Sequence, residues 1–358
     1  MRRWTLIALG SVAVIALVGL AGGCTSRSHV RVVAAPRSAP GTRATAGTPR
    51  TTALLTPVDL EGRSPTQKEL DTIARIVERR FIDAGLPSPS ITNGPAHTLR
   101  FAIQARIIAE QIQQLADRGV FAVRAVLGST TALPAPRPIP SKLAPPSDLP
   151  ATLDKAKAHV GATAYALAQS LTAPPTNKAI IAKLAAFGTL SAEQVAALPA
   201  RMQFRVPTIT CAQLNARSPL FLTDSGYLDR QVTACDETEP NLKYLLGPAE
   251  VRGGDVARAT AEFDPENYAP TGGWLVELDF AAAGEQKVVK LTSAQVGKQI
   301  GILMDGTLVS APYIQETVTG PVTAVGPYTT NAVAHRIAEL VNDGSLPFQL
   351  AVTDVSTN

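Results

Sequence analysis

The sequence is poor in the residue types from which most catalytic and metal sites are built. Only four histidines occur in 358 residues, and they lie too far apart to suggest a set of metal ligands: His29, His97, His159 and His335. Glycine-rich phosphate loops, HExxH and the GxSxG nucleophile elbow are absent. Asp224 and Asp236, near Cys235, are better explained as solvated loop acids than as a catalytic pair. We therefore expect a protein that is not an enzyme and holds neither metal nor cofactor.

The chain also has little net positive charge outside its first fifty residues. Residues 1–50 contain seven of the 33 Lys and Arg and no acid, so the remaining 26 basic residues are outnumbered by 29 acidic ones. This balance argues against a nucleic-acid-binding face. The basic N-terminal segment either contacts anionic lipid or serves only as a solvated, charged tether.

Long hydrophobic runs are absent except at the N-terminus. Arg2 and Arg3 precede an apolar run, Trp4–Leu20, and the small residues Ala21-Gly22-Gly23 then precede Cys24. This order predicts an export signal over residues 1–23 and resembles a lipobox, in which Cys24 would carry the lipid. The lipobox pattern favours Leu where Ala21 stands, and an uncleaved membrane anchor is the alternative. Both interpretations place the rest of the chain outside the cytoplasmic membrane, with residues 24–52 as a disordered tether.

Cysteine is scarce as well, with only three in the chain. If Cys24 carries lipid, Cys211 and Cys235 remain in an oxidising compartment and form a predicted disulfide. The loop between them has 23 residues, and closing it would contribute roughly 3 kcal/mol. A metal site at these cysteines is the weaker alternative because the histidines are scattered.

The periodicity of residues 53–130 predicts a mixed helix and sheet unit. Ala53–Val58, Leu99–Ile103 and Val120–Leu127 have the composition of strands. Ser64-Pro65-Thr66 with Glu69 opens a helix whose apolar residues recur at helical spacing. We expect its solvated face to consist of Arg75, Glu78, Arg79 and Arg80.

A proline-rich segment separates this unit from the rest of the chain. Residues 131–150 contain seven prolines, which predicts an extended, semi-rigid linker. Ala-rich helices are expected to follow, so residues 131–205 form linker and helices together.

The most regular pattern lies in residues 272–350. Residues 274–280 alternate as a half-buried strand does, with Trp274, Val276, Leu278 and Phe280 on one face and Glu277 and Asp279 on the other. Asp305-Gly306 between two apolar runs predicts a hairpin with a type I′ turn. A helix is expected over Ala332–Asn342, with His335 packed on its apolar side.

These segments resemble the extracytoplasmic region of the SecD and SecDF family. The resemblance rests on Trp274–Phe280, Leu291–Gly306, Val309–Pro312, Ile314-Gln315-Glu316 and Gly344-Ser345-Leu346-Pro347. "IVERRFIDAGLPSPSI" in the first unit and Lys243–Ala249, "KYLLGPA", after the last cysteine extend the resemblance in the same order.

The resemblance implies an α+β fold with two subdomains. A ferredoxin-like base would cover residues 53–130 and be completed by 331–352. An inserted or appended α+β head would cover residues 206–330. The Ala-rich helices would be an insertion between the two.

It also implies a function in protein export. The partners would be Sec translocase subunits, unfolded exported polypeptides, or both. The chain has no counterpart to the family's six transmembrane helices, so we expect no proton-driven activity of its own. The alternative is an envelope scaffold or binding lipoprotein that uses the same fold for another partner.

For peptide contact we expect exposed loop residues and a strand edge, since an edge offers main-chain hydrogen bonds. The expected residues are Tyr313, Gln315, Glu316 and Thr319. Trp274, Val276, Leu278 and Phe280 are expected to fill the core of the head instead.

Lipid anchoring gives a direct test. Cys24→Ser should block incorporation of radiolabelled fatty acid and release or mislocalise the protein, because the acceptor thiol is gone. Metabolic labelling and membrane fractionation measure both effects. Unchanged labelling of the variant would contradict the assignment.

Overall fold

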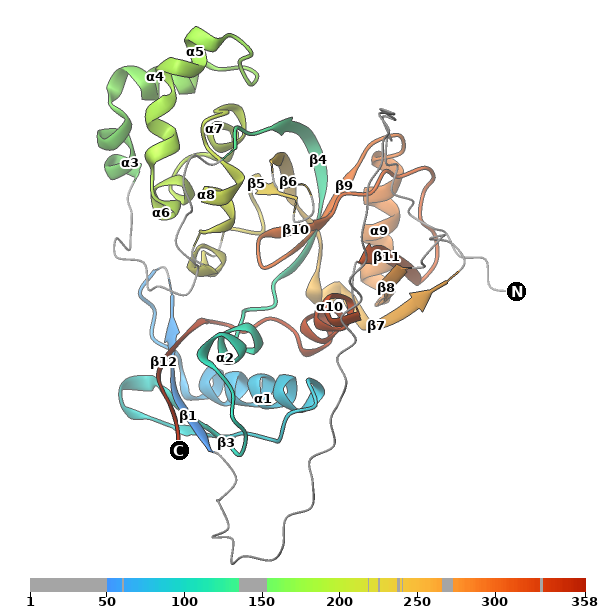
Figure 1. Cartoon of the computed structure of the whole chain (residues 1–358). Helices are drawn as coiled ribbons and strands as arrows, with labels where there is room; N and C mark the ends of the chain where they lie inside the picture. Colours follow the sequence, from blue (N-terminus) through green and yellow to red (C-terminus); the bar gives the residue numbers. More distant parts are fainter. Residues whose placement is uncertain are drawn as a thin grey trace, which may run out of the picture.

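The computed structural model describes residues 50–358 except 60, 135–152, 218, 225, 237–238, 240, 266–272 and 329–330. Cys24, the predicted signal and the tether lie outside the described residues. Figure 1 shows three parts. We call them the base (residues 50–118 and 345–358), the helical insert (153–224) and the head (119–134 and 226–344).

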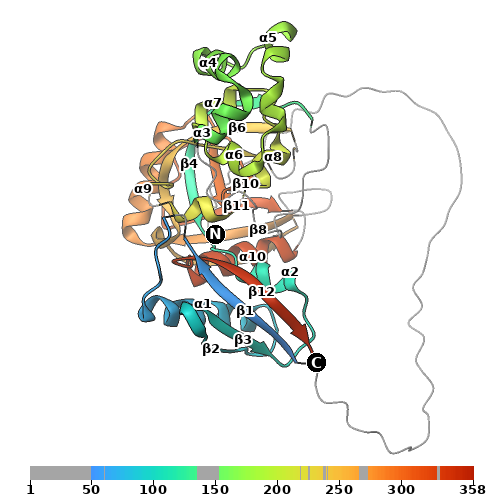
Figure 2. The ribbon, with the colours of Figure 1, turned by 90° about the vertical axis from the view of Figure 1, so that its left-hand side faces the viewer.

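The base is a four-stranded antiparallel sheet with two helices on one face (Figure 2). The strand order is β12-β1-β3-β2. With a helix after the first and third strands in chain order, this is the ferredoxin-like arrangement. The elements are β1 (Thr51–Val58), α1 (Gln67–Asp83), β2 (Ser90–Asn93), η1 (Pro95–His97), β3 (Leu99–Ile103), α2 (Ala109–Leu115) and β12 (Gln349–Thr357). The expected α+β base is therefore present.

Helix α1 forms where its capping residues and apolar stripe place it. Thr66 and Glu69 make a reciprocal capping box, so Thr66 is the N-cap and Pro65 precedes it. The apolar stripe packs on the sheet, where the Phe81 and Phe101 ring centroids are 4.9 Å apart.

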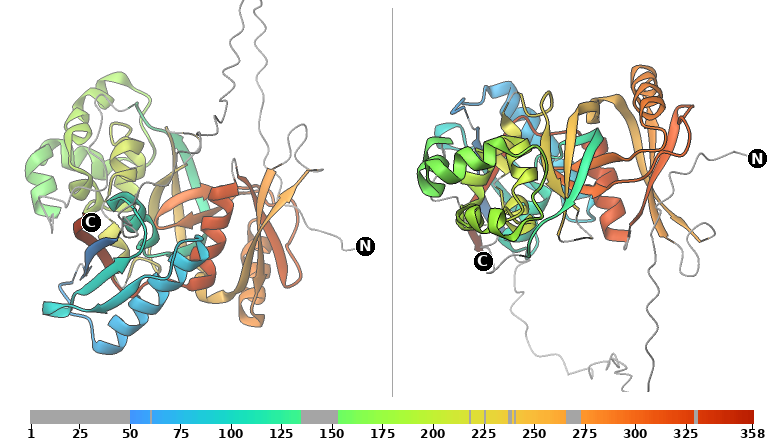
Figure 3. Two further views of the ribbon diagram at one scale, coloured as in Figure 1. Left: turned by 60° about the horizontal axis from the view of Figure 1, so that its bottom comes forward. Right: turned by 90° about the horizontal axis from the view of Figure 1, so that it is seen from above.

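The head contains two antiparallel sheets. The five-stranded sheet has the order β10-β9-β4-β6-β5, and the three-stranded sheet has the order β11-β8-β7. Helix α10 lies between them (Figure 3), and side chains of both sheets and of α9 and α10 share one core. The elements are β4 (Phe121–Thr131), β5 (Val232–Cys235), β6 (Leu242–Arg252), η4 (Gly253–Asp255), β7 (Val256–Asp264), β8 (Gly273–Phe280), α9 (Ala282–Ala294), β9 (Ile300–Met304), β10 (Thr307–Ser310), β11 (Val322–Tyr328) and α10 (Asn331–Asp343).

The hairpin between β9 and β10 forms at the expected turn. Asp305 and Gly306 have φ of 49° and 76°, as a type I′ turn requires. The Asp305 carboxylate also accepts hydrogen bonds from the backbone N–H groups of Gly119 (3.1 Å) and Val120 (2.8 Å). A turn residue thus fixes the chain where it enters β4.

The helical insert packs on the β5–β6 side of the head. It comprises α3 (Leu153–Val160), α4 (Ala162–Ser170), α5 (Lys178–Lys183), η2 (Ala185–Thr189), α6 (Ala192–Ala196), α7 (Ala200–Arg205), α8 (Cys211–Asn215) and η3 (Pro219–Thr223). A disulfide joins Cys211 of α8 to Cys235 of β5, with the Cα atoms 5.6 Å apart. Buried Lys243 of β6 donates to the carbonyls of Gln203, Val206 and Ile209 at 2.9, 2.9 and 3.1 Å. The insert is therefore attached to the head by the disulfide and by the three hydrogen bonds that the Lys243 ammonium donates.

The subdomain boundaries differ from the division expected over residues 53–130, 206–330 and 331–352. Strand β4 pairs with β6 and β9, so it belongs to the head. Helix α10 packs on β7 and β8 and joins the core of the head, although it also touches α1. Of the C-terminal segment, β12 pairs with β1 and completes the base. The head is thus inserted in the chain between α2 and β12 of the base. Its boundaries follow from which strands pair with each other and not from the order of segments along the chain.

The disulfide should stabilise the insert on the head. Replacing both Cys211 and Cys235 by Ala removes a bridge across 24 positions and should lower the free energy of unfolding by roughly 3 kcal/mol. Chemical denaturation of the exported protein measures this difference. In the exported protein with its native sequence, Cys211 and Cys235 should resist alkylation until a reductant is added. Alkylation of either cysteine before reduction would contradict the pairing.

Candidate binding surfaces and the base–head junction

The residues expected to contact peptide lie on one segment between β10 and β11. Tyr313, Gln315, Glu316 and Thr319 are all exposed. Between them, Ile314 and Val318 are 1% and 2% exposed and hold the segment to the core. The Ile314 N–H donates to the Lys298 carbonyl, and the Val318 N–H donates to Oγ1 of Thr292 at 3.0 Å. The segment therefore presents four exposed side chains on a fixed backbone.

The face of β8 that carries Trp274 is mostly buried. Val276, Leu278 and Phe280 lie in the head core, as expected, and Trp274 is partly buried against it. His335 is exposed rather than packed on the apolar side of α10, which corrects the expectation. Its ring centroid lies 5.8 Å from that of Trp274.

Strand edges are less available than the sequence suggested. The edge strands of the five-stranded sheet, β5 and β10, approach each other through a bridge between Asp236 and Leu308, so this sheet curls toward closure. In the three-stranded sheet, β7 is an edge strand. At Ala259 this edge is covered, because the side-chain amide of Asn342 in α10 hydrogen-bonds to both the N–H and the carbonyl of Ala259. The remainder of this edge is a candidate contact for a partner.

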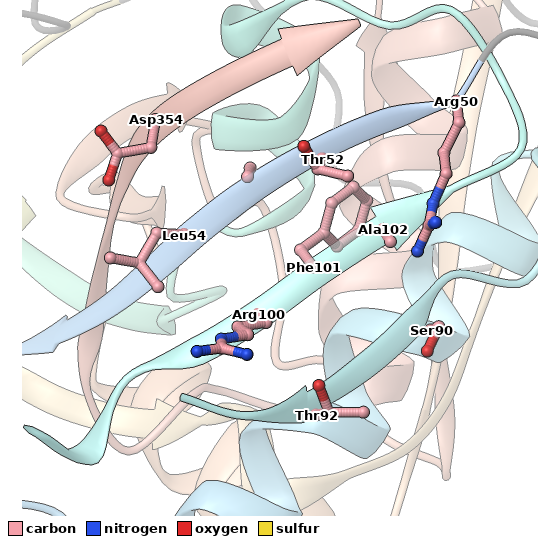
Figure 4. Close-up of a pocket in the computed structure, with 10 residues that line it drawn as sticks. Arg50, Thr52, Leu54, Ser90, Thr92, Arg100, Phe101, Ala102 and Asp354 are labelled. Carbon is pink, nitrogen blue, oxygen red and sulfur yellow. The ribbon is translucent and has the colours of Figure 1, made fainter. Parts of the chain in front are cut away.

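An open depression of about 370 Å³ lies on the outer face of the base sheet. Figure 4 shows Arg50 and Arg100 at opposite ends of it, with Ser90, Thr92 and Thr52 along the strands and Asp354 at the rim. Arg50 and Arg100 are exposed, and Asp354 carries the opposite charge. The depression therefore combines charges of both signs, and exposed charges contribute little to binding. This arrangement defines no ligand.

The chain crosses twice between base and head, and Arg80 of α1 is buried where the crossings meet. Its side chain is 1% exposed, whereas the sequence had placed it on the solvated face of the helix. The guanidinium donates to the carbonyl of Leu115 at the end of α2 (3.2 Å), to those of Asp117 and Arg118 (3.4 Å) on the first crossing, and to that of Gly344 (2.9 Å) on the second. One side chain thus ties both crossings to the base.

Other polar contacts join the same two crossings. Leu346 N–H donates to the Arg118 carbonyl at 2.7 Å, and Arg118 Nε donates to the Leu346 carbonyl at 2.9 Å. Arg336 of α10 pairs with Asp117 at 2.7 Å. Gly119 has φ of 71°, and a Cβ there would lie 2.6 Å from an Arg80 nitrogen, so this position requires glycine.

Burial sets the electrostatics of the junction. It lowers the pKa of Arg80, while the carboxylates of Asp305, Asp343 and Asp117 oppose this shift. Burial raises the pKa of Asp343, which lies 4.0 Å from Arg80 and is 1% exposed. Neither Arg80 Nε nor Asp343 Oδ2 has a hydrogen-bond partner among the described residues. The clamp therefore depends on the four carbonyls more than on the ion pair.

Three further features bear on function. Within the described part of the chain, no three potential metal-ligating side chains come together. Nor does that part include any helix of the length and apolarity needed to cross a membrane. Burial lowers the pKa of Lys243 to about 7, and this ammonium faces carbonyls rather than a cavity, so its role is to hold the insert.

Comparison with known proteins identifies the head. Residues 230–348 match the family model "SecDF, P1 head subdomain". The matched segment includes α10, in agreement with its packing on β7 and β8.

Curated proteins match the chain over longer stretches. The chain is 27% identical over 165 residues to the protein translocase subunit SecD of Streptomyces coelicolor, covering 44% of this chain and 28% of that protein. It is 31% identical over 146 residues to the SecDF of Thermus thermophilus, covering 41% and 18%. A crystal structure of SecDF in its super-membrane-facing form has 19% identity and a TM-score of 0.48, over 87% of this chain and 30% of that one.

The family model places a SecDF-type head at residues 230–348, and the fold described above joins it to an α+β base. The chain accordingly contains a SecD-like soluble region. It spans less than a third of the length of the two curated relatives named above.

The junction predicts a strong asymmetry between two neighbouring arginines. Arg80→Met leaves four carbonyls without their donor and removes the buried positive charge that lies 4.0 Å from Asp343. It should destabilise the protein by about 3–5 kcal/mol. Arg79→Met is the matched control, because Arg79 is 62% exposed at its Asp343 contact; it should change stability by less than about 1 kcal/mol. Urea unfolding distinguishes the two, and equal effects would contradict the clamp.

Proposed function

We propose that this chain is a membrane-anchored, extracytoplasmic accessory of protein translocation. It would bind emerging polypeptide or dock on the Sec translocase, without driving transport by proton movement. The observation that carries the proposal is the match of residues 230–348 to the SecDF P1 head subdomain. The SecD and SecDF relatives, both translocase subunits by name, support the same assignment.

The geometry of the head supports a binding function rather than catalysis. The Tyr313–Thr319 segment presents Tyr313, Gln315, Glu316 and Thr319 outward while Ile314 and Val318 anchor it. A surface held this firmly loses little conformational entropy when a partner binds. The junction around Arg80 orients this surface relative to the base.

The proposed anchor is the lipid on Cys24. Residues 25–49 would separate it from the first base strand. A flexible chain of this length has a root-mean-square span of about 25–30 Å. The base and head would then operate near the membrane surface without being inserted in it.

Site-specific crosslinking in intact cells tests the proposed function. A photo-crosslinking amino acid at Gln315 should capture translocase subunits or unfolded exported precursors, because this side chain is exposed on the head. The same probe at Asp154, whose side chain is 91% exposed on the insert, is the control and should capture neither. Mass spectrometry of the adducts identifies the partners.

The paired substitution Gln315→Ala and Glu316→Ala should lower the yield of these adducts. For this experiment the photo-crosslinking amino acid is placed at Thr319, which is exposed on the same segment. Folding should be unaffected, since exposed substitutions change stability by less than about 0.5 kcal/mol. Capture of a single folded envelope protein would instead support a scaffold function, and adducts of undiminished strength would move the contact site elsewhere.

A further inference from the structure

Strand β7 offers an edge that is already partly occupied by an amide. Its pairing with β8 runs from Val256 opposite Phe280 to Asp264 opposite Gly273. At Ala259 the main-chain N–H donates to Asn342 Oδ1 at 2.7 Å, and the carbonyl accepts from Asn342 Nδ2 at 2.8 Å. The Asn342 side chain therefore occupies the place that a peptide group of a further strand would take.

The edge continues beyond Asn342. In an antiparallel pair, every second residue directs both main-chain groups away from its partner strand. Since Ala259 does so, Ala261 and Phe263 do so too. Neither residue has a main-chain partner on that side among the described residues. Two consecutive outward positions are thus free for main-chain hydrogen bonds.

An aromatic cluster lies at the same end of the strand. Phe263 is 49% exposed, and its ring centroid lies 5.4 Å from that of Trp274, its cross-strand partner. The exposed His335 ring lies 5.8 Å beyond Trp274. The three rings come from β7, β8 and α10, and they flank the free edge with an apolar contact surface.

We propose that an extended polypeptide segment adds to β7 as a fourth strand of this sheet and places an apolar or aromatic side chain on the Phe263–Trp274–His335 cluster. This inference rests on the proposed function and gives it a second contact, distinct from the Tyr313–Thr319 segment. The Asn342 amide bonds Ala259 as a peptide group of a neighbouring strand would, and this observation points to a peptide backbone as the occupant. Main-chain pairing of this kind recognises any extended sequence, with selectivity left to one pocket.

Charge on the strand fits a neutral or mixed partner. Strand β7 carries one basic residue, Arg258, and two acidic ones, Glu262 and Asp264, so it has no excess of positive charge. A polyanion would gain no net attraction there. The aromatic rings then supply the main preference, for an apolar side chain opposite Phe263.

Fluorescence anisotropy with the full chain tests the inference. The probe is a short labelled peptide of alternating Thr and Val with one central Phe. Ala261→Pro removes an outward N–H and places a ring on the edge without removing a bond to β8. Phe263→Ser removes the apolar surface. Each should weaken binding at least about tenfold, whereas Glu262→Ala, on the other face of the same strand, should leave it within about twofold.

Backbone-methylated probes give a test that does not depend on variant folding. N-methylation at alternate peptide positions should abolish binding in one register and leave it nearly unchanged in the other, because only one set of N–H groups faces β7. Equal binding of both registers would overturn strand addition. So would binding that survives Ala261→Pro in a folded variant, an absence of peptide binding, or pairing of two copies through β7 in place of peptide.

Crosslinking separates this inference from the proposed function. If Gln315 adducts with precursors or translocase persist while the peptide experiments fail, the export function stands and the β7 site is wrong. If the peptide binds in the expected register but no export partner is captured, the β7 site stands and the proposed function fails.

Discussion

The burial of one guanidinium determines how the two halves of the molecule are held together. Arg80 can be buried because its guanidinium donates hydrogen bonds to four carbonyls, at the end of α2 and on both chain crossings, and such bonds are strong in a low-dielectric interior. The carbonyls in turn depend on Arg80, since a buried acceptor without a donor is destabilising. Gly119 completes the arrangement by leaving space for the guanidinium. The orientation of head on base is therefore a property of these few groups.

Helix α10 connects this junction to the candidate binding edge. Arg336 and Asp343 on the helix contact Asp117 and the arginines of α1. Asn342 and His335 on the same helix contact the β7 edge and the aromatic cluster. A packed helix moves nearly as a rigid body. Helix α10 therefore contacts both the junction and the β7 edge, and it is the element that would connect a peptide added to β7 with the base.

The local pattern of the sequence predicted most elements but not their grouping. Strict alternation marked β8, and Asp305-Gly306 marked the hairpin, because both signals depend on neighbouring residues alone. The membership of β4 and α10 in the head depends on pairing with distant strands, which periodicity does not report. Arg80 was assigned to the solvated face by its charge. Its spacing from Ile73 and Val77 placed it on the buried stripe of α1, and this was the available signal. Asn342 gave no signal, since its role requires the β7 edge to be in place.

The helical insert lies against the five-stranded sheet of the head and does not cover the β7 edge of the three-stranded sheet. Edge strands invite unwanted pairing, and proteins usually cover or close them. In the five-stranded sheet, β5 carries the disulfide to the insert and meets β10 through the Asp236–Leu308 bridge. Figures 1 and 3 show the insert at the opposite end of the head from β7. The insert therefore protects one sheet and leaves the other accessible. A single Asn342 amide then limits self-pairing on β7 by occupying one position, while Ala261 and Phe263 stay available to a chain that arrives already extended.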